Sequence, residues 1–400
     1  MIMPPWQGSG ITITGVKTIL TAPEGTRLVV VKVETSEPGL YGVGCATFSQ
    51  RAHAVTSAVQ DYLAPLVIGR DPADIEDIWQ SCFLSSYWRS GPVLNNALSG
   101  IDQALWDIKG KLANVPVYQL FGGKVRKAAD VYVHVKGEDA AAVADTITGV
   151  IEQGYRYVRA QPMSPGRLDM TQPTWDGRAY TLAVPRMFDY LRSELGSEIE
   201  LIHDVHERLS PIDAIALAKN LEPYDLYFLE DLFAPEDHEY LRMLRAQSPI
   251  AIASGELYVN QQEYVPLVRD RLIDFIRAHV SALGGLTPAR KLATLCEFFG
   301  IKTAWHGPDD VSPVGHMAQL HLDLSVSNFG IHEAHLFGDR AREVFPGLAQ
   351  VRDGALWSND SPGLGIDIDE AAAARYPYED HPLNGGWPTV RTADGTIVRP

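Results

Sequence analysis

Three short apolar runs of this chain each end in a carboxylate: IELIHD at residues 199–204, LYFLE at 226–230 and IAIASGE at 250–256. The carboxylates are Asp204, Glu230 and Glu256, and 26 residues separate each one from the next. One parallel strand with its helix and two loops needs roughly 25–30 residues, so a βα unit explains this interval. The stretch therefore predicts parallel strands that alternate with helices.

The same alternation extends in both directions, from Val131 to about residue 350. Five further apolar runs carry polar residues near their ends: VYVHV (131–135), YRYVRAQ (155–161), LIDFIRAHV (272–280), IKTAWHG (301–307) and FGIHEA (329–334). Eight such strands predict a closed parallel barrel. An open doubly wound sheet would need a phosphate-binding loop, and the candidate at residues 42–47 lacks the third glycine of that motif.

The first 125 residues follow a different pattern. Residues 11–21 and 27–35 are rich in β-branched side chains and predict two antiparallel strands. From Asn95 to Ala113, apolar residues recur at steps of three and four, which predicts an amphipathic helix. We therefore expect an α/β fold in three parts: an α+β unit (1–125), a barrel (126–350) and a C-terminal segment that returns to the first unit (351–400).

Composition and charge exclude several classes of partner. With 34 Lys and Arg against 50 Asp and Glu, the formal charge is −16, which disfavours nucleic acid and anionic membranes as partners. The sequence has no run of about 18 apolar residues and no signal-peptide pattern at its start. The distant cysteines Cys45, Cys82 and Cys296 are typical of a reducing compartment. We therefore expect a cytoplasmic protein without structural zinc.

The active site of such a barrel lies at the carboxyl ends of its strands, where Asp204, Glu230 and Glu256 would converge. Three buried anions repel one another, and a hard divalent cation with oxygen ligands would neutralise them. The absence of nearby cysteines favours Mg²⁺ over zinc. Alternatively, each carboxylate could cap the helix that follows it. Asp231 should face away from Glu230, because adjacent strand residues point to opposite faces.

Basic and imidazole side chains complete the candidate site. His206 lies two residues beyond the first carboxylate, which would place a general acid or base beside the metal. Arg159 or Arg277 is expected to bind the carboxylate of an anionic substrate. His306 precedes a Gly-Pro turn, a suitable place for a catalytic loop. This set fits removal of a proton α to a carboxylate, with the metal ion stabilising the enediolate.

Metal-assisted hydrolysis is the competing chemistry. Barrel hydrolases with two metal ions usually carry His-x-His on their first strand. Here the corresponding residues 132–136 read YVHVK, so the sequence favours proton abstraction.

Several motifs resemble those of a known family. The barrel carboxylates, the helix GIDQALWDIK (100–109) and the tail PGLG (362–365) resemble the enolase superfamily, mandelate racemase subgroup. A narrower likeness is to D-mannonate dehydratases and the related acid-sugar dehydratases once called starvation-sensing proteins. The motifs that carry it are YWRSGP (87–92), IHDVH (202–206), LED (229–231), HGPDD (306–310), SP (312–313) and NFGI (328–331).

The resemblance implies an N-terminal α+β capping domain over a modified (β/α)7β TIM-type barrel. It implies Mg²⁺ on the three strand-end carboxylates, and His206 as the acid that protonates the departing 3-hydroxyl on the way to a 2-keto-3-deoxy acid. Arg159 would form half of a basic dyad, and Trp88 would belong to the lid over the substrate. The implied partner is a small acid sugar, bound in a homo-oligomer. Sugar contacts would come from His134, Arg277, His306, Asp310 and Glu333.

The sequence departs from the family at three points. Residues 161–177 lack the tyrosine that completes the dyad, Ser49 replaces a sugar-contacting asparagine, and the chain ends without the expected aromatic residue. D-Mannonate activity is therefore expected to be low or absent, with His306 as the remaining candidate base. Two classes of function follow: a dehydratase for another acid sugar, or a Mg²⁺-binding member that has lost dehydration and acts as a binding or regulatory protein.

Overall fold

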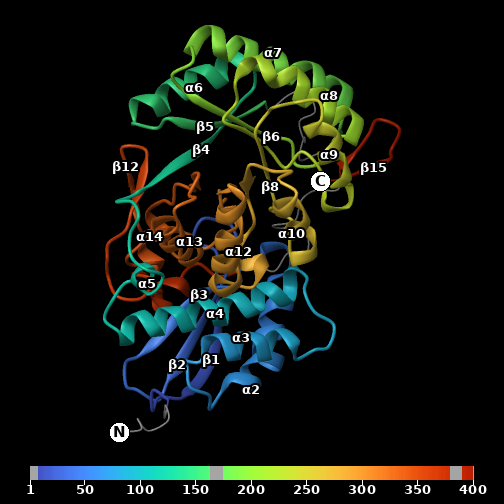
Figure 1. Ribbon diagram of the computed structural model, residues 1–400. Coiled ribbons are helices and arrows are strands. Elements are labelled where there is room, and N and C mark those ends of the chain that lie inside the picture. The colour runs from blue at the N-terminus through green and yellow to red at the C-terminus, as the bar shows by residue number, and fades with distance from the viewer. Residues whose placement is uncertain (1–7, 163–173, 379–389, 400) are drawn as a thin grey trace.

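The computed structural model describes residues 8–162, 174–378 and 390–399. Its N-terminal part is a three-stranded antiparallel sheet with helices packed on it (Figure 1). The strands pair in chain order: β1 (Ile13–Thr21), β2 (Leu28–Thr35) and β3 (Tyr41–Cys45). Helix α4 (Pro92–Leu112) approaches β3 closely, because a Cβ on Gly42 or Gly44 would lie 2.0 or 2.1 Å from a carbonyl oxygen of α4. The predicted strands and amphipathic helix are confirmed.

Shorter elements complete this part of the molecule. They are α1 (Ala52–Ser57), α2 (Ala64–Val67), α3 (Ile75–Leu84), α5 (Val117–Leu120), a 3-10 turn at 49–51 and a π-helical turn at 58–63. The sheet, α4 and the elements between residues 49 and 84 enclose a core of their own, in which Val31 of β2 and Ile101 and Leu105 of α4 are fully or almost fully buried. The α+β unit therefore has a core separate from that of the barrel.

Eight parallel strands of the described chain form a closed barrel (Figure 1). They are β4 (Ala129–Gly137), β5 (Tyr157–Pro162), β6 (Glu200–Asp204), β7 (Phe228–Glu230), β8 (Ile252–Ser254), β9 (Phe275–Ile276), β10 (Lys302–Thr303) and β11 (His332–Glu333). Strand β11 pairs with β4, and a bridge from Thr303 to Phe329 joins β10 to the segment leading into β11. The predicted barrel is confirmed, although β9 and β10 are shorter than the sequence predicted.

Helices connect the strands and surround the barrel. They are α6 (Ala140–Glu152), α7 (Gly177–Leu195), α8 (Pro211–Leu221), α9 (Glu239–Arg245), α10 (Gln261–Arg269), α11 (Val280–Leu283), α12 (Leu286–Phe299) and α13 (Pro313–Ser325), with 3-10 turns at 222–224 and 235–237. Side chains at the N-caps of several of them accept backbone N–H groups, which fixes where each helix begins: Asp139, Asp176, Ser210, Asn260 and Ser312. In the described residues, no helix is long and apolar enough to cross a lipid bilayer.

Apolar side chains from seven strands or strand ends fill the barrel and form the floor of its mouth: Tyr132, Ile202, Phe228, Ala253, Phe275, Ala304 and Ile331. A larger apolar core lies between the strands and the surrounding helices. Because side chains alternate along a strand, the next inward position lies two residues nearer the carboxyl end. The floor therefore determines which residues face the mouth.

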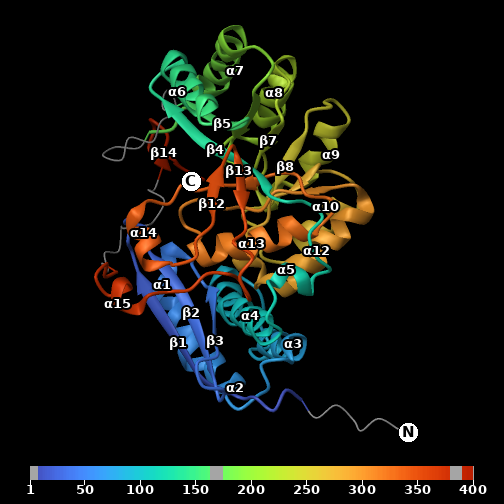
Figure 2. The same cartoon turned by 90° about the vertical axis from the view of Figure 1, so that its left-hand side faces the viewer.

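The chain after the barrel contacts both parts of the molecule (Figure 2). Strands β12 (Gln350–Arg352) and β13 (Ala355–Trp357) form a hairpin, and β13 pairs with the start of β4. Farther on, the Leu364 N–H donates to Asp107 of α4, and the Thr21 hydroxyl of β1 donates to the Ala373 carbonyl. The remaining elements are α14 (Asp339–Val344), α15 (Glu370–Ala373), β14 (Val390–Arg391) and β15 (Ile397–Val398). The boundaries predicted at residues 125 and 350 stay predictions.

Candidate active site

One positional rule builds most of the site. On six strands or strand ends, a polar residue follows the floor residue by two positions: His134, Asp204, Glu230, Arg277, His306 and Glu333. Arg159 follows Tyr157 in the same way, and Tyr157 packs against the floor layer. The period of two along a strand turns all these side chains toward the mouth of the barrel. Residues that lie far apart in the sequence are thereby brought together.

Glu256 reaches the site by an exception to this rule. On β8 the position two residues beyond Ala253 is Gly255, whose φ is 142°. A Cβ there would lie 3.0 Å from the Tyr258 ring and 3.1 Å from a backbone nitrogen, so a larger residue would be strained. The Glu256 carboxylate, one residue later, lies 3.2 Å from Arg277 Nη1. The glycine thus lets the chain turn and aim the next side chain at the site.

Two buried guanidinium groups lie between the carboxylates. Arg159 Nη1 is 2.7 Å from Asp204 Oδ2 and 3.2 Å from Glu230 Oε2. Arg277 Nε lies 3.3 Å from Glu230 Oε1, and its Nη2 donates to Glu333 Oε2 at 2.9 Å. The three predicted metal ligands are therefore neighbours joined through arginines. Among the described residues, the group whose candidate ligand atoms all lie within 4.8 Å of one another is instead His279, His306 and Asp310.

The site carries more negative than positive charge. Burial raises the pKa of Glu230 to about 7 against the opposing effect of the two arginines. Burial and the charge of Asp231 raise the pKa of Glu256 well above its usual value. Five carboxylates belong to the cluster: Asp204, Glu230, Asp231, Glu256 and Glu333. Counted as ionised, together with the two guanidinium groups they give a formal charge of −3. An added cation would offset this excess.

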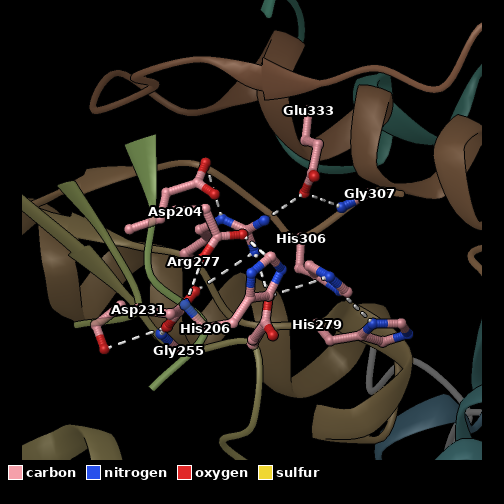
Figure 3. Close-up of polar contacts among 12 residues, drawn as sticks. Asp204, His206, Asp231, Gly255, Arg277, His279, His306, Gly307 and Glu333 are labelled. Carbon is pink, nitrogen blue, oxygen red and sulfur yellow. Dashed lines mark hydrogen bonds and ion pairs between the residues drawn. The ribbon is translucent and has the colours of Figure 1, made fainter. Parts of the chain in front are cut away.

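His206 lies beside Asp204, as the sequence predicts, but a turn rather than strand alternation brings it there (Figure 3). Strand β6 ends at Asp204, and His206 has a φ of 53°. Its backbone N–H donates to Asp204 Oδ1 at 2.9 Å, and its Nε2 lies 2.8 Å from Asp204 Oδ2. Burial opposes ionisation of Asp204, but the charges of His206 and Arg159 outweigh it and hold the pKa of that carboxyl well below its usual value.

Glu333 fixes the tautomer of His134. His134 Nε2 lies 2.7 Å from Glu333 Oε1, and its Nδ1 lies 3.1 Å from Arg159 Nη2. A guanidinium group only donates, so Nδ1 accepts and the Nε2–H donates to the carboxylate. Burial and the charge of Arg159 lower the pKa of His134 to about 4. The other Glu333 oxygen accepts the Gly307 N–H at 2.8 Å (Figure 3).

A pair of histidines lies on the opposite side of the mouth from the Asp204 end of the site. His279 Nδ1 and His306 Nδ1 are 2.8 Å apart (Figure 3). His279 is buried, and its Nε2 has no hydrogen-bond partner in the described chain. Burial raises the pKa of the neighbouring Asp310 to about 7. His279 follows Arg277 by two residues and was not among the residues predicted to form the site.

Lys136 is a further residue that the sequence did not single out. It follows His134 by two residues on β4 and therefore lies on the same face of the strand. Within the described residues, Lys136 makes no hydrogen bond or ion pair. Partial burial and the charge of Arg159 lower the pKa of Lys136. It differs from both arginines of the site, which are paired with carboxylates.

The prediction that Asp231 faces away from the site is wrong. Strand β7 ends at Glu230, and Asp231 has a φ of 37°, so the alternation stops there. Its Oδ1 accepts the Gly255 N–H at 2.8 Å, and its Oδ2 lies 3.7 Å from Arg277 Nη1. Asp231 therefore adds to the negative charge of the site and supports the turn at Gly255.

Trp88 does not meet the other predicted residues. Its side chain is 80% exposed and lines a surface cavity of about 850 Å³ with residues that include Phe83 and Tyr264. The hydroxyl of Ser90 in the same loop donates to the Val259 carbonyl, which docks the loop while leaving the indole in solvent. The place in the lid that the resemblance implies for Trp88 stays a prediction. Most of the tyrosine-free stretch at 161–177 lies outside the described residues.

Comparison with known proteins identifies the family. The family model "Enolase C-terminal domain-like" matches residues 142–372, more than half of the chain, and the mandelate racemase / muconate lactonizing enzyme N-terminal domain matches residues 9–122. The D-galactonate dehydratase family member RspA of Pantoea ananatis is 53% identical, over 98% of this chain and 100% of that protein. This chain belongs to the D-galactonate dehydratase family of the enolase superfamily. The predicted superfamily and acid-sugar dehydratase family are confirmed.

Other relatives agree with this family assignment. A D-galactonate dehydratase family member of Salmonella enteritidis PT4 is 53% identical over 98% of this chain and 99% of its own length. The crystal structure of an enolase from Pantoea ananatis with bound D-gluconate and Mg has a TM-score of 0.94, is 53% identical and covers 98% of this chain and 100% of its own. A putative galactarate dehydratase from Agrobacterium radiobacter, bound to Na and L-malate, is 26% identical, with a TM-score of 0.86 over 97% of this chain and all of its own.

Proposed function

We propose that this family member is a Mg²⁺-dependent acid-sugar dehydratase. It would remove the proton α to a sugar carboxylate and expel the 3-hydroxyl as water, giving a 2-keto-3-deoxy acid. The observation that carries the proposal is the excess of buried carboxylate at the barrel mouth, directly beside the imidazole of His206. The relative with bound D-gluconate and Mg supports both the substrate class and the ion.

Asp204, Glu230 and Glu256 would hold the ion. Their donor atoms are all carboxylate oxygens, which Mg²⁺ prefers, and the negative charge of the cluster exceeds what the two arginines neutralise. The group of His279, His306 and Asp310 suits Mg²⁺ less well, because two of its three ligands are imidazoles. When bound, Mg²⁺ would act as a Lewis acid that stabilises the enediolate oxygens.

His206 is the proposed general acid. It stands next to the first metal ligand, with its Nε2 2.8 Å from Asp204 Oδ2, so its ring proton would be close to a substrate bound at the metal. Positioned acids of this kind typically accelerate a reaction by ~10²–10⁴-fold. The proposed sugar contacts remain those predicted from the sequence: His134, Arg277, His306, Asp310 and Glu333.

Neither Arg159 nor Tyr180 suits the role of the base. Burial alone would lower the pKa of Arg159, but Asp204, Glu230 and Glu333 raise it above its usual value, so the guanidinium stays protonated. Tyr180 is also unsuited, because its hydroxyl donates to His203 Nε2 at 2.7 Å and burial raises its pKa. D-Mannonate turnover is therefore expected to be low, with kcat/KM well below ~10⁴ M⁻¹s⁻¹.

Lys136 is the proposed cation for the substrate carboxylate. Arg159 and Arg277 each contact at least two carboxylates, so carboxylates of the protein already offset their positive charge. Lys136 lies on the same face of β4 as His134, near Arg159, and has no such partner in the described chain. A charge-assisted contact there would hold an anionic sugar over the carboxylate cluster. We also expect a cytoplasmic homo-oligomer without nucleic-acid or membrane partners.

The second candidate function is a member that binds Mg²⁺ and an acid sugar but no longer dehydrates it. The missing tyrosine favours this alternative. The test is a screen of purified protein with Mg²⁺ against aldonic and aldaric acids, D-gluconate, D-galactonate and D-mannonate included, with detection of the 2-keto acid product. Product from one acid that the Glu230→Gln variant does not form supports the dehydratase. Tight binding of an acid sugar without product would instead support the binding protein.

A further inference from the structure

The contact between His279 and His306 is set by the backbone of two neighbouring strand ends. His279 lies immediately before α11, and His306 lies three residues beyond β10. The His306 N–H donates to the Ala278 carbonyl at 3.2 Å, which holds the two segments together. The two Nδ1 atoms consequently face each other at 2.8 Å (Figure 3).

A single proton lies between these nitrogens. At 2.8 Å the contact is a hydrogen bond, so one Nδ1 donates and the other accepts. Two protonated nitrogens or two lone pairs would repel each other at this distance. Burial lowers the pKa of His279 to about 4, which supports a neutral ring with one proton. The tautomer of either ring therefore determines the tautomer of the other.

The surroundings decide the direction of the bond. His306 Nε2 faces Glu256 Oε2 at 3.4 Å, so a proton on Nε2 is attracted to the carboxylate, whereas a lone pair there is repelled. His279 Nε2 has no hydrogen-bond partner in the described residues. A buried N–H without an acceptor is rarer in proteins than an unsatisfied acceptor, so His279 Nε2 is better left unprotonated. Both arguments place the shared proton on His279 Nδ1.

We propose that His279 is a positioning residue that donates from Nδ1 to His306 and thereby fixes His306 as its Nε2–H tautomer. The inference rests on the proposed function in one respect, because Glu256 must be ionised, as a metal ligand is. His306 then meets the substrate as a hydrogen-bond donor beside the metal ligands, suited to an oxygen that gains negative charge. It is not the base that the sequence left as a candidate.

The ¹⁵N resonances of His306 test this directly. Protein labelled with ¹⁵N-histidine is saturated with Mg²⁺, and the His306 signals are assigned as those missing from the His306→Gln variant. Protonated and unprotonated ring nitrogens resonate in separate ranges, and we expect Nε2 in the protonated range and Nδ1 in the unprotonated one. The reverse assignment overturns the proposal. Calorimetry on the same sample reports Mg²⁺ binding independently, so failure of the metal site and a reversed tautomer are different results.

Two variants of His279 separate positioning from packing. In His279→Asn the amide can still donate from near the Nδ1 position, so His306 should keep its proton on Nε2. In His279→Asp a carboxylate only accepts, so the His306 proton should move to Nδ1. An unchanged tautomer in the aspartate variant would contradict the proposal. If that variant does not fold, the spectra of the wild type and of His279→Asn still show whether residue 279 donates to His306 or accepts from it.

Discussion

On both sides of the barrel mouth the alternation of side chains along a strand places the residues, but the charges around those residues differ. On the side of β6 and β7, the carboxyl groups of Asp204 and Glu230 share Arg159. On the side of β9 and β10, His279 is buried and His306 is half-buried, and the two rings have lowered pKa values and share one proton. The first side needs added positive charge, and the second needs its proton on the correct nitrogen. Side-chain position therefore follows from the strand, whereas chemistry follows from the neighbours across the barrel.

Glu256 joins the two sides. It contacts Arg277 at 3.2 Å and His306 at 3.4 Å, and it reaches both because Gly255 adopts a positive φ. A change to Glu256 should therefore affect the metal site and the histidine pair together. Changes confined to one side should leave the other intact, and the predictions below use this difference.

The largest expected effect is on the carboxylate side. If a substrate is found, His206→Asn should reduce kcat by ~10²–10⁴-fold, because the acid for hydroxide departure is lost. KM should change much less, since the imidazole acts mainly in the transition state. Steady-state kinetics with the 2-keto acid assay measures both constants. Wild-type kcat in this variant would remove His206 from the mechanism.

A smaller effect is expected at the rim of the mouth. Lys136→Met should raise KM for the acid sugar by ~10–100-fold, the equivalent of a charge-assisted contact of about 1.5–3 kcal/mol. Lys136→Arg keeps the charge and should recover most of the affinity. Lys219→Met, which removes an exposed lysine of α8, is the matched control and should change nothing. Equal KM values for the two methionine variants would exclude a substrate contact at Lys136.

The smallest effect concerns stability on the histidine side. The folded-state pKa of His279 is about 4, below the usual value of ~6.5, so the unfolded chain binds more protons between these pH values. This contribution is complete above pH ~6.5 and is lost as the pH falls toward 4, by at most ~1.4 kcal/mol per pH unit. In His279→Asn the free energy of unfolding should therefore fall less steeply with acidity. Urea denaturation at several pH values measures the slope, and parallel slopes would disprove this account of His279.

Sequence spacing predicted the barrel and the convergence of its strand-end residues, because the period of two and the length of a βα unit are local properties. It also predicted that His206 lies beside Asp204. It did not predict that Arg159 and Arg277 stand between the carboxylates, since contacts across a barrel depend on rotamers that spacing does not specify. The positive φ of Asp231 was missed because turn conformations are not periodic.

The central claim is that Asp204, Glu230 and Glu256 hold one Mg²⁺, and calorimetric titration of the ion tests it most directly. Each single variant, Asp204→Asn, Glu230→Gln and Glu256→Gln, should bind Mg²⁺ at least ~10-fold more weakly than the wild type while remaining folded. Asp310→Asn, in the group with His279 and His306, should bind it as the wild type does. Unchanged affinity in all three carboxylate variants, or loss of binding in Asp310→Asn alone, would contradict the account.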